Sequence, residues 1–376
     1  MYIKKLKLTD FRNYDSLELD VSPGVNVIYG KNGQGKTNIL EAMFLCSIGK
    51  SFRTSHDIEM IKNDKKSFLI EINIGDNLYG SVSVKYDNKK SKIICVDGAC
   101  IPKMRFLMGK LVGVMFSPED MRLISDGPSQ RRKFIDMAIC QLSSIYYHAL
   151  LMYNKTVKEK NILLSAHDVG KIDKIFLSAY NDALAEYGSL IIFERIKFIK
   201  SLAVYAEESH RFITDKNENI KINYIPSFAA VFSDKDIKEN TVKKNIRELL
   251  CSELNSEKNV CRETERRKCL IGPHRDDFDI VINNVNLKQY GSQGQKRTAV
   301  IAIKLAELSI MREITGRTPV LFLDDVMSEL DGMRKKKLVE CLGGVQTFIT
   351  CTDKDIAGDF ENEGSAVNYI NAEILR

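Results

Sequence analysis

Long apolar runs are missing from this sequence. No stretch approaches the ~20 consecutive apolar residues of a membrane-spanning helix, so we expect no membrane partner. No apolar secretory segment follows the charges of residues 1–5, and we therefore expect a cytoplasmic protein. Internal repeats, low-complexity tracts and long heptad arrays are absent as well, so the 376 residues do not indicate a repeat protein or a long coiled coil.

Cysteine spacing excludes further classes of protein. The 9 cysteines are scattered and include no C-x-x-C pair, which argues against zinc ribbons and thiol redox motifs. An odd number without a framework spacing predicts reduced thiols. No Ser–His–Asp set or cluster of metal ligands indicates a nuclease or another kind of hydrolase. The net charge of +6 permits nucleic-acid binding but does not establish it.

Three stretches of different pattern follow one another along the chain. Residues 1–125 alternate apolar and polar residues over several short runs, as strands do. Residues 126–250 repeat apolar residues at three- and four-residue spacing, which predicts helices. Residues 251–376 return to mixed α/β character and contain an apolar run at 320–323 that is typical of a buried parallel strand. With 44% hydrophobic residues, the chain can form two domains or one domain with a large insertion.

A phosphate-binding loop is the most specific motif in the chain. It follows the pattern G-x-x-x-x-G-K-[ST] and consists of Gly30, Lys31, Asn32, Gly33, Gln34, Gly35, Lys36 and Thr37. A strand-like run at 25–29 precedes it and a helix-like run at 37–45 follows, which is the order that the motif requires. Backbone N–H groups and a helix N-terminus would surround phosphate oxygens. Lys36 would reach the β- and γ-phosphates as a catalytic residue, and the Thr37 hydroxyl would bind Mg²⁺. The alternative is an ordinary glycine turn with an exposed lysine.

Two carboxylates end an apolar strand in the last stretch. Residues 320–323 lead directly into Asp324 and Asp325. A parallel strand delivers such acids to the carboxyl edge of its sheet, beside the phosphate loop. Asp324 would hold Mg²⁺ directly or through water, and Asp325 would act as the general base that polarises the attacking water. The alternative is a strand followed by an acidic turn with no role in catalysis.

The surroundings of this strand resemble the ABC-type ATPases. Their signature motif, S-x-G-Q, matches Ser292, Gly294 and Gln295 upstream of the strand, and their D-loop matches residues 328–331 just after it. The resemblance implies an α/β fold with an ABC-type ATPase head. It also implies an ATP-dependent head-to-tail homodimer, in which the signature residues of one subunit contact the γ-phosphate of ATP bound to the other. ATP would close such a dimer and hydrolysis would open it.

Nearly the whole chain is similar to the RecF family of bacterial recombination mediators. The similar segments are residues 8–14, 49–54, 116–120, 127–132, 184–188, 272–277, 290–298 and 323–331. The resemblance implies a head with mixed sheets built from residues 1–125 and 251–376. A mainly helical arm, residues 126–250, would be inserted into this head. Arg12 would lie near the nucleotide.

The same resemblance implies a function. ATP would drive dimerisation on single-stranded, gapped or linear duplex DNA without sequence preference, and slow hydrolysis would release the DNA. The protein would be a weak DNA-dependent ATPase that supports recombinase loading, replication restart and the SOS response, with partner proteins of the RecR and RecO type. The alternatives are a transporter-type ATPase subunit and a DNA clamp in which ATP is only a structural ligand.

Several positions depart from the ABC-type pattern. Asp325 replaces the usual glutamate, and its shorter side chain predicts slow hydrolysis. The switch histidine is absent from residues 347–353, where either a threonine contacts phosphate or no residue does. Ser117 is the best candidate for the glutamine-loop position. Lys160 precedes Asn161 where an arginine is usual, which keeps the charge but loses bidentate geometry.

Basic clusters and one distinctive segment each allow two interpretations. The clusters lie at residues 130–133, 265–268 and 334–337, without aromatic residues, so they suit DNA phosphates better than bases. The alternative for each cluster is a solvated helix face with acidic partners in the same chain, and the first cluster has a further possible role inside the helical arm. In the distinctive segment, His274 and Arg275 either contact the nucleotide or support the sheet.

Overall fold

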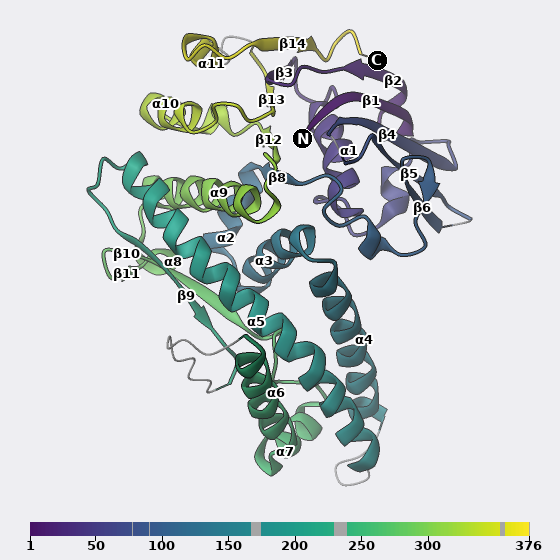
Figure 1. The fold of residues 1–376 in the computed structure, drawn as a ribbon, viewed down its shortest axis with the longest axis vertical. Coiled ribbons are helices and arrows are strands. Elements are labelled where there is room, and N and C mark those ends of the chain that lie inside the picture. The colour runs from purple at the N-terminus through teal and green to yellow at the C-terminus, as the bar shows by residue number, and fades with distance from the viewer. Residues whose placement is uncertain (77, 90, 167–173, 229–238, 354–357, 376) are drawn as a thin grey trace.

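The computed structural model describes the chain except residues 77, 90, 167–173, 229–238, 354–357 and 376, and its described strands form three sheets (Figure 1). The first is antiparallel, in the order β2-β1-β4-β5-β6-β7. Its strands are β1 (Tyr2–Phe11), β2 (Tyr14–Asp20), β4 (Ser67–Gly75), β5 (Ser81–Asp87), β6 (Ser91–Val96) and β7 (Ala99–Cys100). In β1, Leu6 and Leu8 are buried and Lys7 between them is exposed, because successive side chains point to opposite faces.

The β6–β7 hairpin corrects the expectation of reduced thiols. The strand register places Cys95 opposite Cys100, and the two residues form a disulfide. The sequence did not predict this pair, because a separation of five residues matches no common motif and becomes meaningful only once a hairpin brings the strands together. Four of the free cysteines, Cys46, Cys140, Cys269 and Cys351, are buried.

The second sheet is parallel and carries the predicted phosphate loop and acidic strand. Its order is β14-β3-β13-β12-β8, and its strands are β14 (Val367–Asn371), β3 (Val25–Tyr29), β13 (Thr347–Cys351), β12 (Val320–Asp324) and β8 (Gly113–Phe116). Every residue of β12 is buried, as its apolar sequence predicts. Since β3 and β12 both pair with β13 in parallel, the segments that follow them reach the same edge of the sheet.

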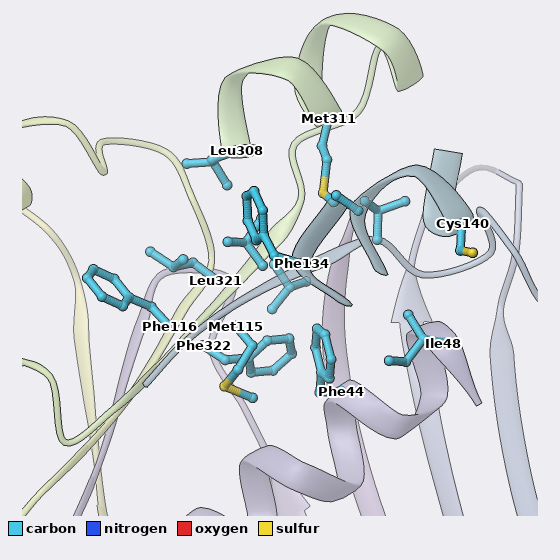
Figure 2. Close-up of a cluster of buried hydrophobic side chains, with 14 of the residues drawn as sticks. Phe44, Ile48, Met115, Phe116, Phe134, Cys140, Leu308, Met311, Leu321 and Phe322 are labelled. Carbon is cyan, nitrogen blue, oxygen red and sulfur yellow. The ribbon is translucent and has the colours of Figure 1, made fainter. Parts of the chain in front are cut away.

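Helix α1 (Lys36–Ile48) lies between these two sheets and is buried on nearly all sides. It shows no amphipathic pattern, because a helix covered on every side has no polar face. Phe44 of α1 makes an edge-to-face contact with Phe322 of β12, with ring centroids 6.0 Å apart. Figure 2 shows that Phe134 of α3 (Pro128–Leu142) and Met311 of α9 (Gln293–Thr315) join the same apolar cluster.

The remaining long helices form an arm that extends away from the parallel sheet (Figure 1). They are α4 (Ser144–Ala166), α5 (Lys174–Ile213), α6 (Glu239–Asn255) and α7 (Glu257–Arg266). Helix α5 packs against α4, α6 and α9, so it connects the arm to the region of the predicted signature motif. The stretch with helical pattern also contains a strand, β9 (Ile220–Ile225), which pairs with β10 (Asp277–Ile282). The boundaries at residues 125 and 250 stay a prediction.

A third sheet and several short elements complete the described structure. The sheet has the order β11-β10-β9, with β11 at Val285–Asn286. The short helices are α2 (Arg122–Ser125), α8 (Leu287–Tyr290), α10 (Gly332–Glu340) and α11 (Gly358–Asn362). Single 3-10 turns are found at Asp57–Met60, Met104–Phe106, Pro118–Met121 and Met327–Glu329. Every helix among the described residues is too short or too polar to cross a bilayer.

Lys160, where an arginine was expected, lies at the centre of the arm. Its side chain is fully buried, and Nζ donates to Glu263 Oε2 at 2.6 Å and to Asn181 Oδ1 at 2.7 Å. A compact ammonium suits two acceptors on different helices, whereas the planar fork of arginine suits one carboxylate. Lys160 therefore binds a second acceptor, Asn181, in place of a second bond to Glu263. Its two contacts join α4 to α5 and to α7.

Candidate functional site

The phosphate loop joins the end of β3 to the start of α1. Gly35 is the N-cap of α1 with a φ of 96°, a left-handed conformation that glycine adopts without strain. A Cβ atom on Gly35 would lie 2.5 Å from the side-chain nitrogen of Asn13. Asn13 donates to the carbonyl oxygen of Gln34 at 3.1 Å and accepts from the amide of Asn38 at 2.8 Å, while the Gln34 side chain donates to Glu373 at 3.1 Å. The turn between β1 and β2 thus holds the loop, a contact that the sequence did not predict.

The side chain of Lys36 contacts the backbone at the start of the phosphate loop. Its Nζ donates to the carbonyl oxygens of Gly30 at 2.5 Å and Lys31 at 2.9 Å, and the residue is only 9% exposed. An ammonium group carries three N–H donors. These two contacts therefore leave one donor of Lys36 for a phosphate oxygen. The exposed tip of the loop consists of Lys31, Asn32 and Gly33.

The predicted metal-binding side chains meet at the shared edge of the sheet. The Thr37 hydroxyl donates to Asp324 Oδ1 at 2.7 Å, and the Thr350 hydroxyl at the end of β13 donates to the same oxygen at 2.7 Å. Among the described hydrogen bonds, none reaches Asp324 Oδ2. Hydroxyl and carboxylate oxygens are the protein ligands that Mg²⁺ prefers, so Thr37 and Asp324 fit this ion.

Asp325 has surroundings different from those of Asp324. β12 ends at Asp324, and Asp325 adopts a left-handed φ of 54°, which turns the chain and leaves its side chain exposed. The N–H of Asp325 donates to the Thr350 hydroxyl at 3.0 Å, and the Ser328 hydroxyl donates to Asp325 Oδ1 at 3.1 Å. One carboxylate is therefore buried against the loop and its neighbour faces solvent, and their roles as metal ligand and general base stay predictions.

Thr350 lies in the segment 347–353, where the sequence lacks the switch histidine. Its hydroxyl donates to Asp324 and accepts from the backbone of Asp325, so the described contacts of this threonine are with the two acids. The sequence indicated that a threonine of this segment could contact phosphate. It did not predict the bridge, because the partners lie 26 and 25 positions away in the chain.

Arg12 is held against α1. Its Nε and Nη2 donate to the two carboxylate oxygens of Glu41 at 2.9 and 2.7 Å, and its Nη1 donates to the Glu59 carbonyl at 2.7 Å. Glu41 is fully buried and also accepts from Ser51 and Arg53. Glu41 therefore binds side chains from two of the segments that are similar to the RecF family, residues 8–14 and 49–54. A contact of Arg12 with nucleotide stays a prediction.

The signature residues form the start of α9. Ser292 is its N-cap, the Ser292 hydroxyl accepts from the N–H of Gln295 at 3.2 Å, and the Gln295 side chain accepts from the N–H of Ser292 at 3.0 Å. This capping box fixes the first turn of the helix. The other end of the Gln295 amide donates to Glu218 Oε1 at 2.8 Å, so the side chain is held at both ends. Ser292 is exposed at a helix N-terminus, where negative charge is favoured.

The D-loop is joined to the signature turn. Arg334 of α10 donates to the Thr298 hydroxyl at 2.8 Å and lies 3.5 Å from the Gly294 carbonyl oxygen, while Asp331 caps α10 and pairs with Arg334. Arg297 donates to the Glu329 carbonyl at 3.0 Å. Among the described contacts, no residue from 292 to 295 reaches the phosphate loop of the same chain.

Ser117 and the segment around His274 have structural contacts. Ser117 and Asp120 form a capping box around the 3-10 turn at Pro118–Met121, with the Ser117 N–H donating to Asp120 at 2.7 Å. A glutamine-loop role for Ser117 stays a prediction.

His274 is paired with the Tyr153 hydroxyl at 2.7 Å and the Cys269 carbonyl at 3.1 Å, and burial lowers its pKa to about 4. These contacts hold His274 between α4 and the segment that precedes β10, which favours a structural role over contact with nucleotide.

Comparison with known proteins covers nearly the whole chain. Residues 2–363 match the family model described as the RecF/RecN/SMC N terminal domain. The "DNA replication and repair protein RecF" of Acetivibrio thermocellus is 40% identical over 100% of this chain and 99% of that protein. The protein of the same name from Clostridium perfringens strain SM101 is also 40% identical, over 100% of this chain and 99% of that protein.

Solved structures show the same likeness. "Structure of the recombination mediator protein RecF-ATP in RecFOR pathway" aligns with a TM-score of 0.84 at 37% identity, over 94% of this chain and 92% of that chain. The "SmcHead bound to the C-winged helix domain of ScpA" aligns with a TM-score of 0.52 at 13% identity, over 96% of this chain and 92% of that chain, which shows the fold alone. Together with the mixed sheets and long helices, these matches confirm the expected fold class, an ABC-type head with a helical arm.

Proposed function

Because the chain belongs to the family of the RecF/RecN/SMC N-terminal domain, and within it to the RecF proteins of DNA replication and repair, we propose that it is an ATP-dependent DNA-binding protein of recombinational repair. The observation that carries this proposal is the hydrogen bond between Thr37 and Asp324, which lie 287 positions apart. It joins the phosphate loop to the acidic strand, as the binding of a triphosphate with Mg²⁺ requires. The solved relative described as RecF-ATP supports the choice of nucleotide.

ATP would lie along residues 30–37, with the backbone N–H groups and Lys36 directed at its phosphates. Thr37 and Asp324 would hold Mg²⁺, which supplies neutralisation of the negative charge on the phosphates. Asp325 would orient the attacking water and accept its proton, since its carboxylate is exposed beside the loop. An aspartate reaches less far than the usual glutamate, so we expect slow hydrolysis.

A second copy of the chain would complete the site. Ser292, Gly294 and Gln295 lie at the start of α9, and their described contacts do not include the phosphate loop of their own chain. In a head-to-tail homodimer these residues would meet the γ-phosphate of ATP bound to the partner subunit, because a helix N-terminus attracts anions. ATP would therefore close the dimer and hydrolysis would open it.

The proposed dimer would act on DNA in the cytoplasm. It would assemble on single-stranded, gapped or linear duplex DNA, and it would support recombinase loading and the SOS response with partner proteins of the RecR and RecO type. Its hydrolysis would be weak and DNA-dependent. The head would consist of residues 1–125 and 251–376 and the arm of residues 126–250. The description of a solved relative as a recombination mediator in the RecFOR pathway supports these partners.

Sedimentation velocity with ATP tests the shared site. We expect the parent protein to shift from monomer to dimer, and the Ser292→Arg variant to remain a monomer that still binds ATP, because the arginine would occupy the position of the γ-phosphate. Ser165→Arg, at an exposed residue near the end of α4, is the matched control and should dimerise like the parent protein. Dimerisation of the Ser292→Arg variant at the parental ATP concentration would refute the shared site.

Single-turnover hydrolysis distinguishes this function from a clamp with a structural ATP. Bound ATP would be hydrolysed faster with gapped duplex DNA than without it if DNA regulates the site. Equal rates with and without DNA would favour the clamp.

A further inference from the structure

The three basic clusters of the sequence differ in the partners that their side chains have. In the first cluster, Arg131 is buried and donates to both carboxylate oxygens of Asp277 at 2.6 and 2.9 Å. Arg132 donates to the Asp276 carbonyl at 2.8 Å, and Lys133 donates to the Phe52 carbonyl at 3.3 Å. These side chains hold α3 against β10 and the head, so this cluster is mainly structural.

The third cluster, residues 334–337, is also partly occupied. Arg334 pairs with Asp331 and binds the Thr298 hydroxyl. Lys337 lies 3.4 Å from Asp215 and 4.3 Å from the centroid of the Phe212 ring. The two ends of this cluster therefore join α10 to the signature turn and to the end of α5.

The second cluster belongs to a longer basic face on α7. Lys258, Arg262 and Arg266 follow one another at four-residue spacing, which places them on one side of the helix. Arg267, the C-cap in a left-handed conformation, and Lys268 continue the face beyond the last turn. All five residues are exposed, and none takes part in an ion pair among the described residues. The exposed carboxylates of the same segment are Glu257 and Glu265.

The opposite side of α7 anchors it firmly to the arm. Glu263 is buried and accepts from Lys160 at 2.6 Å and from the N–H of Leu270 at 2.7 Å. Asn259 and Thr264 are buried on the same side. The basic face is therefore presented on a fixed helix, and Figure 1 places α7 at the end of the arm away from the parallel sheet.

We propose that the basic face of α7, defined as Lys258, Arg262, Arg266, Arg267 and Lys268, binds the phosphate backbone of DNA; this assignment rests on the function proposed above. From Lys258 to Arg266 the helix rises by about 12 Å, a length over which one strand of duplex DNA presents roughly three phosphates. The exposed side of the helix carries no aromatic or large aliphatic side chain. Protein interfaces are rich in such anchors, so this face suits a polyanion better than a protein surface.

Salt-dependent DNA binding tests the assignment on the full-length protein. We compare the parent protein with a variant that combines Lys258→Gln, Arg262→Gln and Arg266→Gln, by anisotropy of a labelled linear duplex with ATP at several salt concentrations. Affinity falls with salt, and each lost phosphate contact makes the slope of log affinity against log salt less negative by about 0.9, so we expect the magnitude of the slope to decrease by roughly two to three. Affinity at low salt should fall at least tenfold, while ATP turnover without DNA stays unchanged.

The matched control removes three lysines that have acidic partners. It combines the substitutions to glutamine of Lys155, Lys197 and Lys244, which pair with Glu159, Glu239 and Glu248. We expect its DNA affinity and salt slope to stay close to those of the parent protein. An unchanged slope in the α7 variant, or an equal loss in the control, would overturn the assignment while leaving the proposed function intact. Absence of DNA binding by the parent protein would overturn the proposed function and the assignment together.

Discussion

At the scale of single residues, Thr350 has the most informative position in the site. Its hydroxyl donates to Asp324 at 2.7 Å and accepts from the N–H of Asp325 at 3.0 Å. It therefore fixes the direction of the proposed metal ligand and the backbone turn that exposes the proposed general base. Residues that orient a metal ligand through a hydrogen bond typically contribute about 10- to 100-fold to metal affinity.

The substitution Thr350→Val tests this role. It keeps the shape of the side chain but leaves Asp324 without one donor and the N–H of Asp325 without its acceptor. We expect the Mg²⁺ concentration for half-maximal ATP turnover to rise by roughly 10-fold or more, measured by Mg²⁺ titration at saturating ATP. Thr347→Val is the control, because Thr347 is equally buried on the same strand and, among the described contacts, its hydroxyl bonds only to the Val345 carbonyl at 3.1 Å. An equal effect of both substitutions would show that Thr350 has no specific role.

The sequence predicted the place of single residues in the fold where those residues lie within one short segment. The strand–loop–helix pattern placed the phosphate loop at a sheet edge, and the apolar run at 320–323 placed Asp324 and Asp325 there. It did not predict Asn13, Glu41 or Glu218, because each acts on a residue distant in the chain. The sequence did contain one signal for such a contact, because Glu41 is a charged residue within an apolar helical run and a buried charge needs a partner.

At the scale of elements, the Glu218 side chain joins the segment after α5 to the start of α9. Glu218 follows α5 and accepts from the Gln295 amide at 2.8 Å, and the same amide accepts from the N–H of Ser292. His210 of α5 is buried 3.6 Å from Glu218, and burial lowers its pKa. The arm therefore contacts the signature turn through a short polar chain.

The substitution Glu218→Ala tests whether this contact positions the signature turn. We expect ATP-driven dimerisation to weaken by about tenfold, since a hydrogen bond to a charged group contributes roughly 1.5 kcal/mol or more. ATP binding by the monomer should not change. Asp215→Asn is the control at the same end of α5, because Asp215 is exposed and pairs with Lys337, and ion pairs with an exposed partner contribute little. Parental dimerisation of the Glu218→Ala variant, measured by sedimentation at several ATP concentrations, would contradict the prediction.

Among the elements, the sequence missed those whose partners come from another stretch. β9 alternates Ile220 and Ile222 with polar residues, but it lies inside a stretch where helical spacing dominates. Its partner β10 follows more than 50 residues later, so no local hairpin pattern announced the pair. The β6–β7 pairing of Cys95 with Cys100 was missed for a different reason, since β7 is only two residues long.

At the scale of the whole molecule, buried charge joins the arm to the head. Arg195 of α5 is 2% exposed, donates to the Pro273 carbonyl at 2.6 Å and pairs with Asp136 of α3 at 2.8 Å. His274 lies next to this junction and contacts Tyr153 of α4. Residues 272–277, which gave two interpretations in the sequence, thus connect α3, α4 and α5 to β10.

His274 predicts how the stability of the molecule depends on pH. Its pKa is about 4 in the folded protein because of burial, whereas a histidine in an unfolded chain has a pKa of about 6.5. Between these values the unfolded chain binds a proton that the folded protein does not. The free energy of unfolding therefore falls as pH decreases from about 6.5 to about 4, by up to roughly 3 kcal/mol for this residue.

Denaturant unfolding at pH 7 and pH 4.5 measures this effect. His274→Gln keeps a polar group beside Tyr153 and Cys269 but does not titrate, so the variant should lose less stability on acidification than the parent protein. The control His56→Gln changes an exposed histidine and should follow the parent protein. An identical loss in parent and His274→Gln proteins would show that His274 is not the acid-sensitive group.

Helix α5 has a mechanical consequence that follows from its length. It contains 40 residues without a break, so it extends for about 60 Å from the end of the arm to the signature turn. For a rigid rod of this length, a tilt of about 5° at the nucleotide end displaces the other end by about 5 Å, nearly one helical turn. The arm would then work as a lever, and a change too small to alter the shape of the nucleotide site would be large where the arm ends.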